Sequence, residues 1–117
     1  MPSLRLLAAA LSVAALAALP GPATAAEITS PEDGAVVTER PELRWRLGPG
    51  EESRRVVIYT ESGGHAQPAR AIAVGSDDTS VVVDAPLAPG TWWWRVEGRR
   101  FVISATASAE RRFVVPE

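Results

Sequence analysis

Residues that often carry chemistry are few and scattered in this chain. His65 is the one histidine, cysteine is absent, and the one methionine is Met1. A metal site needs several ligands close together, and calcium takes about six to eight oxygens from a shaped loop. The acidic pairs Glu32-Asp33 and Asp77-Asp78 lack such a ligand spacing and lie among turn-forming residues. We therefore expect no metal site, no cofactor and a solvated His65.

Nucleophilic catalysis also lacks its usual components. A serine nucleophile needs a base beside it, and the chain has no G-x-S-x-G segment that would present one. A glycine-rich loop that could hold a phosphate is absent as well. The sequence thus predicts a protein that is not an enzyme and has no catalytic residues.

A run of aromatic residues could instead bind a partner. Successive side chains of a strand point to opposite faces. The inward set would be Trp45, Trp92, Trp94 and Val96. Trp93 and Arg95 would then lie on the outer face, where Tyr59 could join them across the sheet. Two interpretations of Trp93 stay open: packing under Arg95 or beside Tyr59, or a contact platform for a protein or a glycan. The candidate binding residues are therefore Trp93, Arg95 and Tyr59.

These aromatic residues belong to short β segments separated by turns. Residues 42–47 alternate between apolar and charged side chains, as expected of a strand with one buried face. The phase of residues 54–60 stays open because both faces are apolar, and 99–108 could be a strand extension or a long loop. The expected strands cover residues 27–30, 42–47, 54–60, 69–74, 79–84, 91–97 and 110–115, with 35–37 a brief extended piece. About seven strands at this spacing predict an all-β fold, a single antiparallel two-sheet sandwich.

Three segments also carry a family resemblance. They are Ser30 to Gly34 with Pro41 to Trp45, then Leu-Ala-Pro-Gly-Thr-Trp-Trp-Trp-Arg-Val at 87–96, and Arg112 to Val115. Their order resembles the fibronectin type III and related immunoglobulin-like domains of bacterial exported proteins. The resemblance spans about residues 27 to 115 and implies a fibronectin type III-like sandwich. Trp92 stands where that family usually has a tyrosine whose hydroxyl bonds back to the backbone. Either the indole N–H substitutes for that hydroxyl or the bond is absent.

The first 25 residues have the pattern of a secretory signal peptide. Arg5 precedes the apolar run 6–19, and Ala23-Thr24-Ala25 supplies the small residues of a cleavage site. This apolar run is shorter than the roughly 20 residues that cross a bilayer. We therefore favour cleavage after Ala25, or one residue later after Ala26, over a retained membrane anchor. The mature domain would be 26–117, with no stable membrane anchor.

The charge pattern argues against nucleic acid as a partner. All 12 basic residues are arginine, against 14 acidic residues, which with the many alanines indicates a high-GC bacterial source. A nucleic-acid-binding domain normally has a net positive charge or a basic stripe. Here the arginine pairs are spread among acids, and we interpret them as solvated strand ends and edge protection. The pairs are Arg54-Arg55, Arg99-Arg100 and Arg111-Arg112.

The sequence as a whole favours an exported, non-enzymatic binding or accessory module that acts through an exposed sheet face or loops. Its location would be secreted or in the extracytoplasmic cell envelope, with a protein or a glycan there as the partner. Two alternatives are a structural cell-envelope domain and a carbohydrate-binding sandwich that uses exposed aromatics. Sugar binding usually takes several coplanar exposed aromatics, and Trp93 is the one good candidate. The binding or accessory module and the structural domain are therefore favoured over the carbohydrate-binding sandwich.

Overall fold

The computed structural model describes residues 25–63, 67–101 and 104–117, and these residues form nine β-strands and no helix. The strands are β1 (Glu27–Ser30), β2 (Ala35–Val36), β3 (Glu42–Arg46), β4 (Glu51–Tyr59), β5 (Arg70–Ala73), β6 (Ser80–Val82), β7 (Gly90–Arg100), β8 (Ser104–Ala107) and β9 (Arg111–Val115). The predicted signal peptide lies almost entirely outside the described residues. Among those residues, no helix has the length and apolar character that crossing a bilayer requires.

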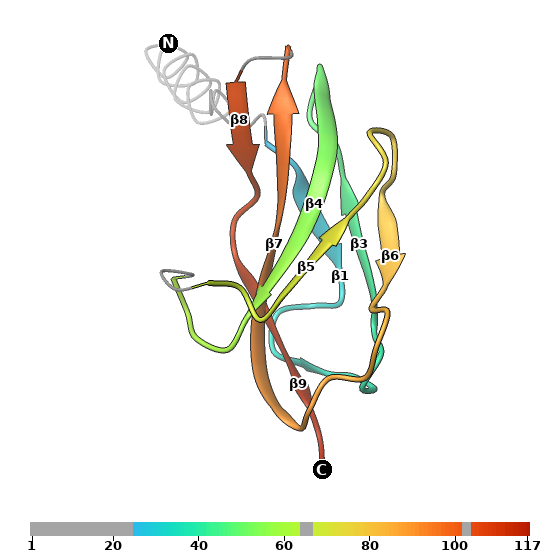
Figure 1. Cartoon of the computed structure of the whole chain (residues 1–117), viewed down its shortest axis with the longest axis vertical. Helices are drawn as coiled ribbons and strands as arrows, with labels where there is room; N and C mark the ends of the chain where they lie inside the picture. The colour runs from blue at the N-terminus through green and yellow to red at the C-terminus, as the bar shows by residue number, and fades with distance from the viewer. Residues whose placement is uncertain (1–24, 64–66, 102–103) are drawn as a thin grey trace, which may run out of the picture.

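The strands form two sheets that pack face to face (Figure 1). The smaller sheet has the order β1-β3-β6, and the larger one has the order β2-β9-β7-β4-β5, with β8 paired to the upper part of β7. The pairs are antiparallel except β2 with β9. The predicted all-β two-sheet sandwich is confirmed.

The structure has two more strands than predicted because two short segments pair with neighbouring strands. The brief extended piece at 35–37 pairs with β9 as β2. The open segment 99–108 continues β7 to Arg100 and then folds back as β8, with Arg100 opposite Ser104. The strand-extension alternative is therefore correct, with a hairpin in place of a long loop.

The core lies between the sheets and follows the predicted alternation. Leu43 and Trp45 of β3 are buried, while Arg44 and Arg46 point to solvent. Burying a large apolar side chain contributes about 1.5–3 kcal/mol, so these inward rows hold the two sheets together. The inward residues of the larger sheet include Val56, Ile58, Trp94, Val96 and Phe113.

The three core-side tryptophans differ in how their indole N–H groups are satisfied. The Trp45 N–H donates to the Ser53 hydroxyl at 2.8 Å, which in turn donates to the Asp78 carbonyl at 2.8 Å. The Trp94 N–H is buried without a partner in the described part of the chain. Trp92 is half-buried at the margin of the core and donates to the Ala88 carbonyl at 2.9 Å. The indole therefore does substitute for the tyrosine hydroxyl at this corner.

Candidate binding face on the larger sheet

The outer face of the larger sheet carries the residues that the sequence analysis selected. In the register of the strands, Trp93 of β7 lies opposite Tyr59 of β4 and Arg112 of β9. Two residues further along β7, Arg95 lies opposite Val57 of β4. Because Trp94 and Val96 point into the core, the alternation of the strand places Trp93 and Arg95 on the outer face, as predicted.

Exposure divides these three candidates. Trp93 and Arg95 are half-buried, but Tyr59 is only 5 % exposed. The expectation that Tyr59 serves as an exposed aromatic is therefore wrong. Its ring instead lies beneath Arg95, whose guanidinium carbon is 5.2 Å from the ring centroid. The same guanidinium donates to the Tyr59 hydroxyl at 3.1 Å.

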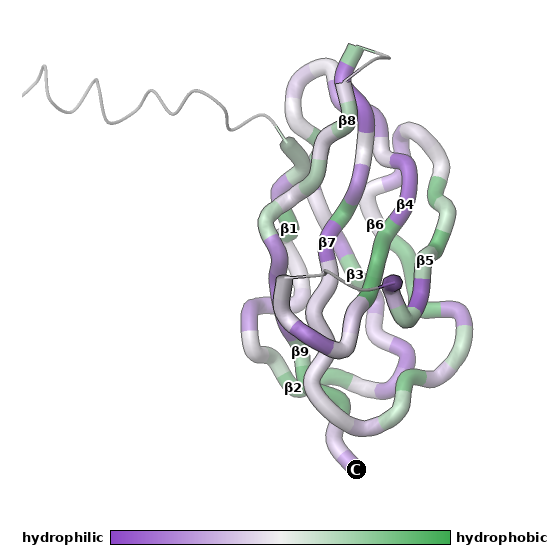
Figure 2. The backbone as a smooth tube through the Cα atoms, turned by 60° about the vertical axis from the view of Figure 1, so that its left-hand side comes forward, coloured by the Kyte–Doolittle hydropathy of each residue, from purple (hydrophilic) through white to green (hydrophobic). Residues whose placement is uncertain are grey.

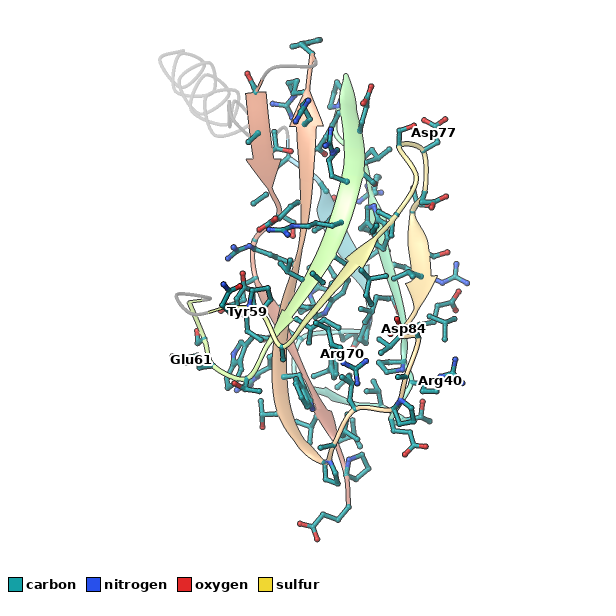
Figure 3. The ribbon with its side chains drawn as sticks, in the orientation of Figure 1. Arg40, Tyr59, Glu61, Arg70, Asp77 and Asp84 are labelled. Carbon is teal, nitrogen blue, oxygen red and sulfur yellow. The ribbon has the colours of Figure 1, made fainter. Side chains whose placement is uncertain are left out.

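The chain segment after β4 explains the burial of Tyr59. The Ser62 hydroxyl and the Gly63 backbone N–H each donate to the carboxylate of Glu110 at 2.8 Å. Glu110 immediately precedes β9, which lies on the far side of β7 from β4. Residues 60–63 must therefore cross the outer face, and Figure 3 shows Tyr59 beside this segment, with Glu61 further along it. Val57 is likewise buried although it points outward.

A ladder of charged groups continues from Tyr59 along β7. Arg95 donates to Glu97 at 3.1 Å, and Arg55 of β4 donates to the other oxygen of Glu97 at 2.6 Å. Burial by itself would raise the pKa of Glu97. The hydrogen bonds and positive charges of Arg55 and Arg95 outweigh it, so the pKa lies below its ordinary value. The hydrogen bond to Glu97 also raises the pKa of Arg55. Arg95 is thereby held between Glu97 and Tyr59.

A β-bulge in β4 changes what its arginines do. The register with β7 shifts between Ser53 and Arg55, and two consecutive exposed residues interrupt the alternation at this point. Arg54 and Arg55 consequently both point outward from a strand that lies between β7 and β5. The interpretation of this pair as a strand end or edge protection is wrong, because β4 is an interior strand.

Glycine is required opposite this bulge. A Cβ atom added at Gly98 would lie 2.5 Å from the backbone oxygen of Glu52 and 3.1 Å from the Thr106 hydroxyl. The Thr106 hydroxyl donates to Glu51, a buried carboxylate that also accepts the Gly48 N–H at 3.1 Å. The two strands and β8 can therefore approach closely only where β7 has no side chain.

The sequence did not predict that Glu97, Glu110 and Arg54 would belong to the outer face of the larger sheet. A pairing of Glu97 with Arg95 is suggested by their i, i+2 spacing in a strand, but nothing local connects Glu110 to residues 62 and 63. Among the described residues, no group of three or more histidine, cysteine, aspartate or glutamate side chains is placed to hold a metal. His65 lies outside the described residues.

Comparison with known proteins supports the same class of fold. The computed model matches the solved structure of a Fn3-like protein from Clostridium thermocellum, with a TM-score of 0.56 and 22 % sequence identity. The match covers 81 % of this chain and 96 % of that one. No family model matches the chain, and no curated protein does. The fold is therefore a fibronectin type III-like β-sandwich, which confirms the resemblance seen in the sequence.

Proposed function

We propose that this module is an exported, non-enzymatic binding or accessory domain that contacts a protein of the cell envelope through the outer face of the larger sheet. The observation that carries the proposal is the setting of Trp93. It is half-buried on that face, and its neighbours Tyr59 and Arg95 are held by hydrogen bonds and ring contact. Tryptophan, tyrosine and arginine are the residue types that dominate protein interfaces.

Pre-organisation is the physical advantage of this arrangement. A side chain that becomes ordered on binding costs about 0.5–1.5 kcal/mol, and Arg95 is already fixed between Tyr59 and Glu97. A partner that covered Trp93 would gain its apolar area without ordering the residues beneath it. This combination favours a binding role over a purely structural one.

A protein partner is favoured over a glycan because of Tyr59. A sugar-binding platform would use Trp93 and Tyr59 together, but the Tyr59 ring is covered by Arg95 and by residues 60–63. Tyr59 is therefore not available as a second exposed aromatic beside Trp93.

Export is supported by the sequence of residues 1–25 and by where the folded domain begins. Ala26 is buried as part of the core cluster, and β1 starts at the next residue. Cleavage after Ala25 would leave this residue in place, whereas cleavage after Ala26 would remove it. We therefore favour the first of the two predicted cleavage positions, with a secreted or envelope location for the product.

Capture from envelope extract, with a glycan array in parallel, tests the proposal. The bait is the chain as recovered after export, with Trp93→Ser as the test variant and Val82→Ser as the control. Val82 is 50 % exposed on β6, in the opposite sheet. The expected result is a discrete protein retained by the parent and the control but lost by Trp93→Ser. Equal capture by all three would contradict the proposal, and glycan binding that depends on Trp93 would favour the carbohydrate alternative.

A further inference from the structure

One strand of the larger sheet forms an edge that lacks the usual protection against pairing. Among the strands that the structure describes, β8 pairs with β7 alone, and it is the outermost of them on its side of the sheet (Figure 1). Natural edges are normally blunted by charge, proline or a bulge. The four residues of β8 are Ser104, Ala105, Thr106 and Ala107, which include neither a charge nor a proline.

The free backbone groups of this edge belong to Ala105 and Ala107. Ser108 donates its backbone N–H to the Val96 carbonyl at 2.8 Å, and Thr106 lies opposite Gly98. Residues of an antiparallel strand direct their backbone groups alternately to the two sides. The N–H and C=O groups of Ser108 and Thr106 therefore face β7, and those of Ala105 and Ala107 face outward. This edge can accept the backbone of another extended chain.

The face beside this edge is positively charged. A groove of about 530 Å³ runs between β4 and β8, and Arg54, Arg55 and Arg99 line it. Its other lining residues are Glu97, Gly98, Ala105, Thr106 and Ala107, most of them small. In Figure 2 strongly hydrophilic positions recur along the upper part of β7, while β8 beside it is pale to green.

The charges in this groove are not balanced. Glu97 already binds Arg55 and Arg95, and Glu52, which lies opposite Arg99 in register, forms no ion pair in the part of the chain that the structure describes. Arg54 and Arg99 likewise form no ion pair there. Arg99 lies directly opposite Ala105, whose methyl group leaves room for a guanidinium to extend over the free edge.

We propose that the β8 edge binds an extended segment of a partner protein that carries acidic side chains at alternate positions. The segment adds as a further strand, and its backbone pairs with Ala105 and Ala107. Its carboxylates point to the outer face, where Arg99 contacts them and Arg54 adds positive potential. The inference rests on the proposed binding function and gives that function a partner chemistry.

Two other occupants fit these observations less well. A second copy paired edge to edge would bring its own arginine-lined groove close to this one, and the like charges of the two grooves would repel each other. A phosphate-bearing polymer would match the arginines but has no peptide backbone to pair with Ala105 and Ala107.

A defined peptide tests the inference directly. The probe is acetyl-(Glu-Thr)₄-amide, titrated against the intact chain while backbone amide signals are followed by NMR. The matched probes are the same peptide N-methylated at alternate residues, (Lys-Thr)₄ and inorganic polyphosphate. We expect the acidic peptide to shift the amide signals of residues 104–107 and to slow hydrogen exchange at Ala105 and Ala107. N-methylation should weaken binding at least about tenfold, because it removes backbone pairing but no charge.

Charge-reversal variants locate the contact. Arg99→Glu should weaken peptide binding about tenfold or more, as expected for the loss of one charge-assisted contact. Arg44→Glu, on the smaller sheet, should leave the affinity within about twofold of the parent. The inference is overturned if the lysine peptide or the N-methylated peptide binds as well as the acidic one, if Arg99→Glu has no effect, or if no probe binds. It is also overturned if polyphosphate binds more tightly than the peptide.

The result also separates this inference from the proposed function. Failure of the peptide with continued loss of capture in Trp93→Ser would remove the β8 inference and leave the binding face intact. Peptide binding together with unchanged capture in Trp93→Ser would remove the role of Trp93 and leave the edge as the binding element.

Discussion

Replacing Trp45 and Trp94 separately by phenylalanine should produce clearly different losses of stability. Both side chains are almost fully buried in one core, and each substitution removes the same part of the indole. They differ in their N–H groups, because that of Trp45 donates to Ser53 at 2.8 Å and that of Trp94 has no partner among the described residues. The comparison therefore isolates the free energy associated with one buried N–H.

The magnitudes follow from these two settings. Partial truncation of a buried indole should cost about 1–2 kcal/mol, less than the roughly 3–5 kcal/mol of Trp→Ala. At Trp94 the change also removes an unsatisfied N–H, which is worth about 1–3 kcal/mol in the opposite direction. We thus expect Trp94→Phe to lie between about 1 kcal/mol less stable and about 2 kcal/mol more stable than the parent. Trp45→Phe loses a hydrogen bond worth about 1 kcal/mol as well, for a total cost of about 2–3 kcal/mol.

Urea denaturation of the two variants and the parent gives the free energies of unfolding, provided that the m-values agree. A double-mutant cycle with Ser53→Ala should give a coupling energy of about 1 kcal/mol with Trp45 and none with Trp94. Equal losses of stability in the two phenylalanine variants would contradict this prediction, as would a greater loss at Trp94.

Three further predictions concern Gly98 opposite the β-bulge, the charged residue Glu97 and the predicted signal peptide. Gly98→Ala should cost about 1–3 kcal/mol by denaturation, because its Cβ would meet the Glu52 backbone oxygen at 2.5 Å; an unchanged midpoint would contradict the close approach. Since the pKa of Glu97 is lowered in the folded state, its contribution should be complete above about pH 4.3 and be lost as pH falls through the folded-state pKa. The stability difference between the parent and Glu97→Gln should therefore shrink in acid, and a difference that grows there would have the wrong sign. Mass spectrometry of exported protein should find Ala26 at the N-terminus, and an intact Met1 would refute cleavage.

The parts of the fold that depend on local pattern could be predicted from the sequence. The alternation of Leu43 and Trp45 with arginines defined β3. The position of Trp93 between two inward tryptophans placed it on the outer face. Turn residues separated the strands at nearly the right places. Each of these signals lies within a few residues of the feature that it predicts.

The parts that depend on distant residues could not be predicted. The phase of β4 was ambiguous because Val57 is as apolar as its inward neighbours and is buried although it lies on the outer face. Likewise, the outward direction of both Arg54 and Arg55 depends on a bulge set by the pairing with β7. Tyr59 was assigned to the exposed surface because the contact of Ser62 and Gly63 with the distant Glu110 has no local signal in the sequence.

Photo-crosslinking in a bacterial host that expresses the full chain tests the proposal that the outer face of the larger sheet contacts an envelope protein. Arg112 is exposed and lies opposite Trp93 in register, so Arg112→p-benzoylphenylalanine places the probe beside the proposed anchor without replacing it. The same probe at Val82 samples the opposite sheet. We expect a discrete adduct at position 112 that disappears in Trp93→Ser, with none at position 82. No adduct at position 112, or the same adducts at both positions, would contradict it.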